Sequence, residues 1–239
     1  MKFLKRLLLI FLVVVIVFIG VCYANGKKLY DSQLSKINLE DKIQNIKSSK
    51  SFVYLKDLPE YYKNAVVAVE DHRYYNHGAI DVIALGRAFV SNIKQKDFKE
   101  GGSTITQQTA KNLYFITEDD VISRKVAEAI LSFELEKKYS KDEILELYVN
   151  TIYFGDGYYG IKEACEGYLS KAPKDMTLYD ATMLAGIPNA PSVYAPTANF
   201  NLTQSRQKKV VSSMVEYEYL SEDEANVLYN QIENGTYSR

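Results

Sequence analysis

The stretch AVVAVEDHRYYNHG, Ala65 to Gly78, joins an apolar run to a pair of acidic residues and a glycine turn. The apolar run predicts a buried helix, and Gly78 predicts a turn that follows it. Glu70 and Asp71 are therefore expected at a helix end beside a loop, where catalytic acids often lie. Acidic residues at a helix C-terminus oppose the helix dipole, so their position has no evident structural benefit. A solvated helix end is the alternative to a catalytic pair.

Helix start signals recur on both sides of this stretch. Pro59 suits a first helical turn, and a serine or threonine followed three residues later by an acidic residue has the spacing of a capping box. This spacing occurs at Thr117 and Asp120, Ser140 and Glu143, Thr177 and Asp180, and Ser221 and Glu224. No alternating run of strand length and no internal repeat interrupts these signals. The sequence therefore predicts a mainly α fold.

The N-terminal segment reads as a membrane anchor. An uncharged run from Leu7 to Ala24 follows three basic residues and is long enough to cross a bilayer. A cleaved signal peptide is the alternative, because Cys22 and Ala24 are small residues at cleavage-site spacing, but the run exceeds the usual length. We expect a cytoplasmic tip and transmembrane helix over residues 1–24, a polar stalk or linker over 25–51 that could instead be a loosely packed helix, and a folded domain over 52–239.

Charge and cysteine usage exclude several classes. The chain carries 29 basic and 30 acidic residues, so nothing suggests a nucleic-acid binder, and an anionic ligand would need a local cluster of cations. Cys22 lies in the apolar run and Cys165 in the folded part, so no disulfide is expected between them. His72 and His77 are the only histidines. Without a third ligand of zinc-site type nearby, packing or hydrogen bonding is their expected role.

A polar stripe is predicted in the segment that begins GGSTITQQ, Gly101 to Gln108. If Ser103 caps a helix, several hydrogen-bonding side chains and one cation share a face, namely Thr104, Gln107, Gln108 and Lys111. Such a face suits a sugar or a phosphate. The alternative is a solvated surface, which would normally carry more Glu and Lys.

The segment RKVAE, Arg124 to Glu128, places a carboxylate three and four residues from two cations. Alone, this is the pattern of an ordinary surface salt bridge. Together with Lys111, however, Arg124 and Lys125 would supply three cations, which could spread the charge of a departing pyrophosphate.

These blocks occur in the order and approximate spacing of a known family's signatures. The match also includes Asn112 and the segment KDEILELYVN, Lys141 to Asn150. The chain resembles the peptidoglycan glycosyltransferases, the lysozyme-like glycosyltransferase family 51 found alone or fused in class A penicillin-binding proteins. The resemblance covers about Phe52 to Ala225. It implies a mainly α, lysozyme-like glycosyltransferase fold with a larger helical lobe and a smaller membrane-associated lobe, preceded by one transmembrane helix. Ala79 to Ile93 is the expected membrane contact.

The resemblance also implies a reaction. An acceptor sugar 4-hydroxyl attacks the anomeric carbon of a lipid-pyrophosphate donor, lipid II, with inversion and release of undecaprenyl pyrophosphate. Glu70 is the expected base. Glu128 is the second catalytic glutamate, but its neighbouring cations should keep it ionised, so we expect it to orient Arg124 and Lys125. The expected substrate-binding residues are Asp71, His77, Ser103, Thr104, Gln107, Gln108, Lys111, Asn112, Arg124 and Lys125.

No protein-bound metal and no required cofactor are predicted, although a divalent cation, Mg²⁺ or Mn²⁺, could assist as a Lewis acid. The expected partners are lipid II, the growing lipid-linked glycan chain, the membrane and other cell-wall synthesis proteins. The expected location is the cytoplasmic membrane, single-pass, with the catalytic domain on the extracytoplasmic face. The serine-x-x-lysine matches at Ser91 and Ser205 lack the companion transpeptidase motifs, so a monofunctional enzyme is expected. A lysozyme-like glycan-cleaving enzyme and a non-catalytic cell-wall scaffold are the alternatives.

Overall fold

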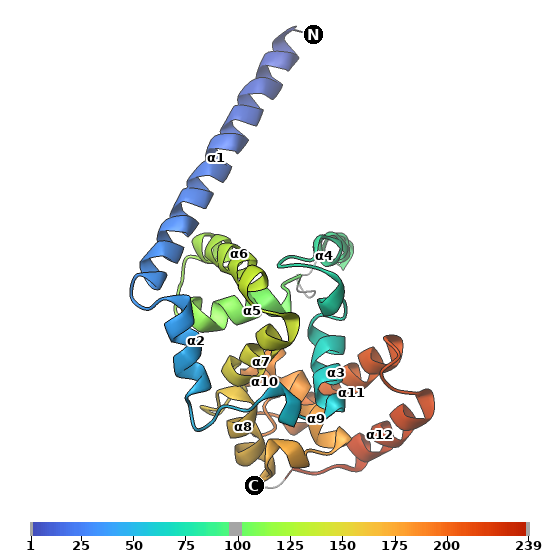
Figure 1. Cartoon of the computed structure of the whole chain (residues 1–239). Coiled ribbons are helices and arrows are strands. Elements are labelled where there is room, and N and C mark those ends of the chain that lie inside the picture. Colours follow the sequence, from blue (N-terminus) through green and yellow to red (C-terminus); the bar gives the residue numbers. More distant parts are fainter. Residues whose placement is uncertain (1, 96–101, 238–239) are drawn as a thin grey trace.

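The structure, a computed structural model, describes residues 2–95 and 102–237. Its first element, α1 (Lys2–Leu34), is one continuous helix that rises from the domain (Figure 1). Among the described helices, it is the one that is long and apolar enough to cross a membrane. Its apolar side chains from Phe3 to Tyr23 are mostly exposed, as expected for a helix that meets lipid.

The lower end of α1 packs against α6 (Val121–Lys138). Gly26 allows this close approach, because a Cβ added there would lie only 2.4 Å from the Cβ of Val126. The Tyr30 hydroxyl donates a hydrogen bond to Glu134 of α6. The anchor is thus joined to the domain by packed side chains.

The segment predicted as a stalk, residues 25–51, contains folded structure. The last turns of α1 pass through its first part, and α2 (Leu39–Lys47) follows, with the Asn38 side chain capping its first turn. Leu39 and Ile43 are buried in the main hydrophobic core. The folded unit in the structure therefore includes α2.

The helices of the domain surround one main core. The longer ones are α3 (Glu60–Glu70), α4 (Val82–Gln95), α6, α7 (Lys141–Thr151), α9 (Leu178–Gly186), α11 (Phe200–Glu216) and α12 (Glu222–Asn234). The shorter ones are η1 (Leu55–Asp57), η2 (Tyr74–Asn76), α5 (Ile105–Ala110), η3 (Lys111–Phe115), α8 (Gly160–Ala164), η4 (Cys165–Leu169), η5 (Pro173–Asp175), η6 (Ile187–Asn189) and α10 (Pro191–Tyr194). In the described ranges there is no strand, only an isolated bridge between Tyr153 and Tyr159. The predicted mainly α fold is confirmed.

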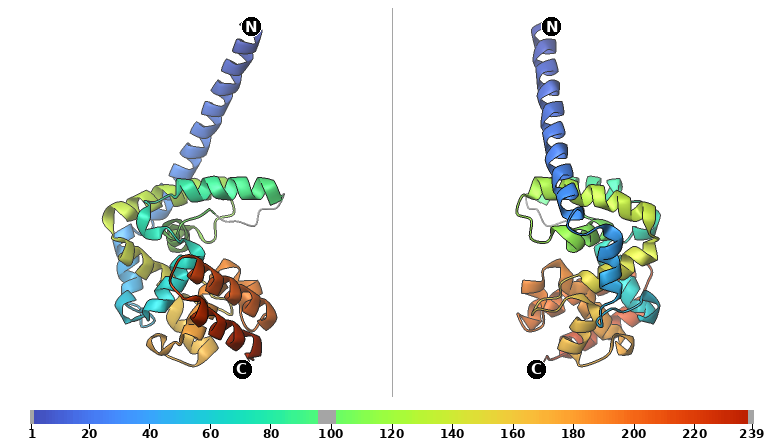
Figure 2. Two further views of the ribbon diagram at one scale, coloured as in Figure 1. Left: turned by 90° about the vertical axis from the view of Figure 1, so that its right-hand side faces the viewer. Right: turned by 60° about the vertical axis from the view of Figure 1, so that its left-hand side comes forward.

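Two groups of helices position the site. α3 packs against α9 and α11, and α5 packs between α6 and α7. Figure 2 shows α4 and α6 at the end of the domain from which α1 rises, with α9, α11 and α12 at the opposite end. Val82 and Ile83 of α4 are exposed apolar residues, 76% and 60% accessible. This exposure agrees with the membrane contact expected for residues 79–93.

Three of the four expected capping boxes are confirmed, at the starts of α7, α9 and α12. The box expected from Thr117 to Asp120 is wrong. Asp120 itself is the N-cap of α6, and its carboxylate accepts from the backbone N–H groups of Ile122 and Ser123. One aspartate therefore accepts from two of the backbone N–H groups that the first turn leaves unpaired. As predicted, the two cysteines are free.

Candidate active site

A cavity of about 610 Å³ lies where the end of α3 meets α4, α5, η3, α6 and α11. Its lining includes the carboxylate of Glu70 and five cations, which are Arg87, Lys111, Lys125, Arg206 and Lys209. Several segments that are far apart in the sequence contribute these groups. An anionic ligand would meet a concentration of positive charge here.

Glu70 is the last residue of α3, as predicted, and its side chain is 8% exposed. One carboxylate oxygen accepts a hydrogen bond from Gln108 Nε2 at 2.9 Å, and the other lies 3.4 Å from Nη2 of Arg206. Burial raises the pKa of Glu70, whereas the Gln108 hydrogen bond and the Arg206 charge lower it. Burial is the larger effect, so the pKa lies above the ordinary value, which favours a role as a base.

Arg206 contacts the Glu70 carboxylate, and the sequence analysis did not single it out. It lies on α11, its Nε donates to the Gly186 carbonyl at 3.2 Å, and its guanidinium stands over the Tyr194 ring. Arg206 and Lys209 are three residues apart, so they share a helix face, but such a basic pair is common on solvated surfaces. No local pattern links Arg206 to Glu70.

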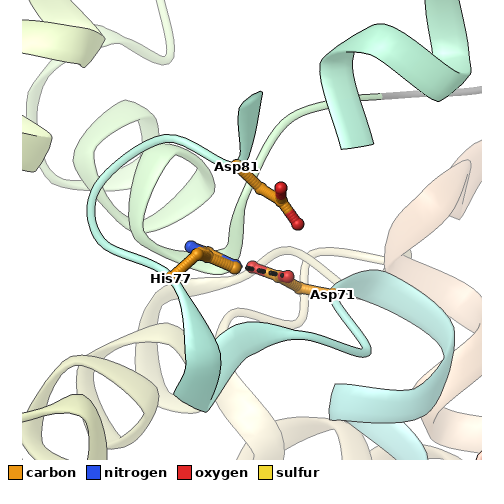
Figure 3. A group of neighbouring side chains, drawn as sticks. All are labelled: Asp71, His77 and Asp81. Carbon is orange, nitrogen blue, oxygen red and sulfur yellow. Dashed lines mark hydrogen bonds and ion pairs between the residues drawn. The ribbon is translucent and has the colours of Figure 1, made fainter. Parts of the chain in front are cut away.

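Asp71 turns away from Glu70 toward the start of α5. Its Oδ1 lies 2.8 Å from Nε2 of His77 (Figure 3). Its Oδ2 accepts a hydrogen bond from the backbone N–H of Ile105 at 3.0 Å. The carboxylate thus fastens the loop after α3 to α5. Asp71 lines the cavity and His77 does not. We expected Asp71 and His77 to bind substrate, but their polar atoms form contacts within the protein.

Asp71, His77 and Asp81 place ligand atoms within 4.8 Å of one another, a spacing that could suit a metal ion. The surroundings do not fit one. His77 Nδ1 lies 2.6 Å from the Gly78 carbonyl, so oxygen acceptors face both ring nitrogens. Asp81 accepts from two backbone N–H groups at the start of α4 and pairs with Arg73 Nε at 3.2 Å. Because a metal ion would have to displace these partners beside the Arg73 charge, we assign no metal site.

The polar stripe at α5 is divided between two tasks. Thr104, not Ser103, caps the helix, because Thr104 and Gln107 form a complete capping box and the Thr104 hydroxyl also donates to the Ala79 carbonyl. Thr104 and Gln107 therefore hold the helix start, although Gln107 also lines the cavity. Ser103 instead lies 3.3 Å from Lys125 Nζ. Only Gln108 of this turn contacts the Glu70 carboxylate.

Lys111 and Asn112 follow α5 in η3, a turn of π-helix, and both line the cavity. Burial, together with the charges of Arg124 and Lys125, lowers the pKa of Lys111. The Nδ2 amide nitrogen of Asn112 has no hydrogen-bond partner within the described part of the chain. Lys111 thus offers a cation to an incoming ligand, whereas the Asn112 amide nitrogen is itself buried.

Glu128 is completely buried and holds two cations of its own helix. Its Oε2 lies 2.6 Å from Lys125 Nζ, and its Oε1 lies 3.4 Å from Arg124 Nε. Lys125 reaches the cavity, but Arg124 and Glu128 do not line it. The Arg124 Nη1 donates to the Glu118 carbonyl at 2.8 Å. Of the three expected cations, the structure therefore brings Lys111 and Lys125 to the cavity.

His72 lies at the cavity wall and stacks on Tyr217, with ring centroids 4.2 Å apart. Burial and the charge of Arg87 lower its pKa. The packing role expected for this histidine is confirmed.

Residues 39–215 match the family described as "Transglycosylase". Penicillin-binding protein 1A of Neisseria lactamica is 41% identical over 182 residues, which are 76% of this chain and 23% of that protein. Penicillin-binding protein 1F of Bacillus subtilis (strain 168) is 39% identical over 213 residues, 88% of this chain and 30% of that protein. The chain thus spans less than a third of the length of either relative.

The crystal structure of penicillin-binding protein 1A from Haemophilus influenzae aligns with 56% of this chain and 17% of that one. The identity is 27% and the TM-score is 0.39, too low to bear on the fold.

Proposed function

Because the chain belongs to the transglycosylase family, we propose that it is a membrane-anchored peptidoglycan glycosyltransferase that polymerises lipid II. The 4-hydroxyl of an acceptor sugar attacks the anomeric carbon of the donor, the bond to the pyrophosphate breaks, and the anomeric centre inverts. Undecaprenyl pyrophosphate leaves, and repeated transfer lengthens the glycan strand. The observation that carries this proposal is one cavity holding both a buried glutamate of raised pKa and a group of cations.

Glu70 acts as the base. A sugar hydroxyl is a poor nucleophile until its proton is removed, and a carboxylate with a raised pKa accepts that proton more readily. Gln108 and Arg206 hold the two carboxylate oxygens in the cavity wall. These contacts fix the direction from which the acceptor hydroxyl must approach.

The leaving pyrophosphate lies at Lys111 and Lys125. Preorganised cations stabilise negative charge as it develops on the leaving group. Glu128 serves as a positioning residue, because its buried carboxylate holds Lys125 Nζ at 2.6 Å. Its partners are cations, and it does not reach the cavity, so it orients charge rather than moving a proton.

A divalent cation, Mg²⁺ or Mn²⁺, would enter as a Lewis acid bound to the pyrophosphate oxygens. The cavity cations already neutralise part of that charge, and Glu70 is occupied by Gln108 and Arg206. We propose no protein ligands for the ion.

The membrane anchor and the basic residues before it determine the proposed orientation of the chain in the membrane. Lys2, Lys5 and Arg6 favour a cytoplasmic N-terminus, so the domain faces outward, where it meets lipid II and the growing lipid-linked glycan. Protease treatment of intact cells should degrade the domain, and the mature protein should begin at Met1. A protected domain, or a mature N-terminus at Asn25, would contradict this topology.

The direct test incubates the detergent-solubilised chain with purified, labelled lipid II. We expect glycan polymer and an equivalent release of prenyl pyrophosphate. A lysozyme-like hydrolase would instead shorten preformed glycan without releasing prenyl pyrophosphate, and a scaffold would yield neither product. Either of these results would refute the proposed function.

A further inference from the structure

α6 carries apolar side chains on two opposite faces. One face, which includes Ala127 and Leu131, is buried in the core. The other face has helical spacing and consists of Ile122, Val126, Ala129, Ile130 and Phe133, with Val126 packed against Gly26 of α1 and the rest partly or largely exposed. On this face, Ile122 is 54% exposed and Phe133 is 59% exposed. Exposed apolar stripes of this kind mark binding surfaces for apolar partners.

This face forms one wall of a groove of about 670 Å³, with Val121 at its end and Tyr23 of α1 beside it. Figure 2 shows α6 at the lower end of α1, where that helix joins the domain. The groove therefore opens where the chain leaves the membrane. We name it the α1–α6 groove.

One charged residue lines the α1–α6 groove, within the part of the chain that the structure describes, and it is Lys125. The same lysine lines the catalytic cavity, where Glu128 and Ser103 hold its ammonium group at 2.6 and 3.3 Å. The α1–α6 groove and the cationic cavity thus share the Lys125 side chain in their walls. This arrangement is complementary to an amphiphile with an anionic head and a long apolar tail.

We propose that the α1–α6 groove binds the prenyl chain of the lipid-pyrophosphate donor, with the pyrophosphate at Lys125. The inference rests on the proposed function and adds a binding site for the part of the donor that does not react. Bulk phospholipid could cover the apolar face, but its occupancy would not depend on a pyrophosphate. A second copy of the chain could also cover it, but would exclude the prenyl chain.

The first test is photolabelling of the full chain in detergent with a prenyl pyrophosphate that carries a diazirine on the prenyl chain. Mass spectrometry should locate the label between Val121 and Phe133 and around Tyr23. Unlabelled prenyl pyrophosphate should compete at least tenfold better than the corresponding prenyl alcohol. Labelling confined to other segments, or equal competition by the alcohol, would overturn the inference.

The second test compares Phe133→Asn with Val227→Asn, a matched substitution of an exposed apolar residue on α12. With a long-chain donor, Phe133→Asn should raise KM about tenfold, since an apolar contact with the lipid is lost. With a short-chain donor, KM should stay within about twofold of the wild-type value. Val227→Asn should change neither value.

The outcomes separate the two proposals. A wild-type chain that polymerises lipid II, but shows equal KM changes for short-chain and long-chain donors in Phe133→Asn, overturns the groove alone. A wild-type chain that makes no polymer overturns the proposed function, whereas labelling in the groove would still support a prenyl pyrophosphate site.

Discussion

Replacing Glu70 by Gln removes the proposed base while nearly keeping its shape. A general base contributes about 10²- to 10⁴-fold to the rate, or about 3–5 kcal/mol of barrier. The upper half of that range is expected, because the carboxylate is 8% exposed and little water can replace it. The raised pKa of Glu70 means that burying its charge costs more folding stability than Gln108 and Arg206 return, so the neutral amide should not lower the stability of the fold.

The assay is the release of prenyl pyrophosphate from labelled lipid II at saturating donor, with thermal unfolding measured in parallel to separate the two effects. Glu70→Gln should lower kcat by about 10³-fold or more and leave KM within about threefold, since base catalysis acts on the chemical step. Glu216→Gln is the matched control, because Glu216 is an exposed carboxylate that lines the same cavity. A Glu70→Gln protein that turns over within tenfold of the wild type would refute the assignment.

Three further variants test the neighbours of Glu70. Arg206 lowers the pKa of Glu70, and the base must be ionised, so Arg206→Gln should move the acidic limb of the pH–rate profile to higher pH; an unmoved limb contradicts this. Glu128→Gln should keep measurable turnover and the wild-type acidic limb of the pH–rate profile, but it should raise the KM for the donor, because Lys125 loses its carboxylate partner. If this variant were as inactive as Glu70→Gln, Glu128 would be a proton-transfer group. Asp71→Asn should cost about 1.5–3 kcal/mol of unfolding free energy, measured by denaturant titration, since a buried charged acceptor is lost; an unchanged midpoint would refute its positioning role.

Local sequence patterns predicted where helices begin when residues within one turn are enough to cap the helix. Ser140 and Glu143, for example, are sufficient to close a capping box at the start of α7, and they do. At Thr117 the same spacing failed, because Asp120 accepts from two N–H groups of α6 on its own. Spacing defines which residues can meet, but not which of two competing acceptors takes a donor.

The sequence predicted only part of the candidate site, because contacts between segments far apart in the chain leave no local pattern. Glu70, Gln108, Lys111 and Lys125 lie on short motifs and do line the cavity. Arg206 is brought to Glu70 by the packing of α11 on α3, and no local pattern encodes a contact over that distance. Thr104 and Gln107 have the right spacing for a ligand face, yet they are used to start α5.

Because α1 is one unbroken helix, the thickness of the bilayer should affect the position of the domain. The helix has 33 residues and at about 1.5 Å per residue is about 50 Å long, whereas the hydrocarbon core of a bilayer is about 30 Å thick. Its lower end is packed on α6, so the height and tilt of the domain follow those of the helix. A thicker bilayer would draw the domain toward the membrane or tilt it, and a thinner bilayer would let the domain stand farther from the membrane. We therefore expect bilayer thickness, at constant lipid charge, to affect how the cavity meets the lipid-linked substrates proposed for it.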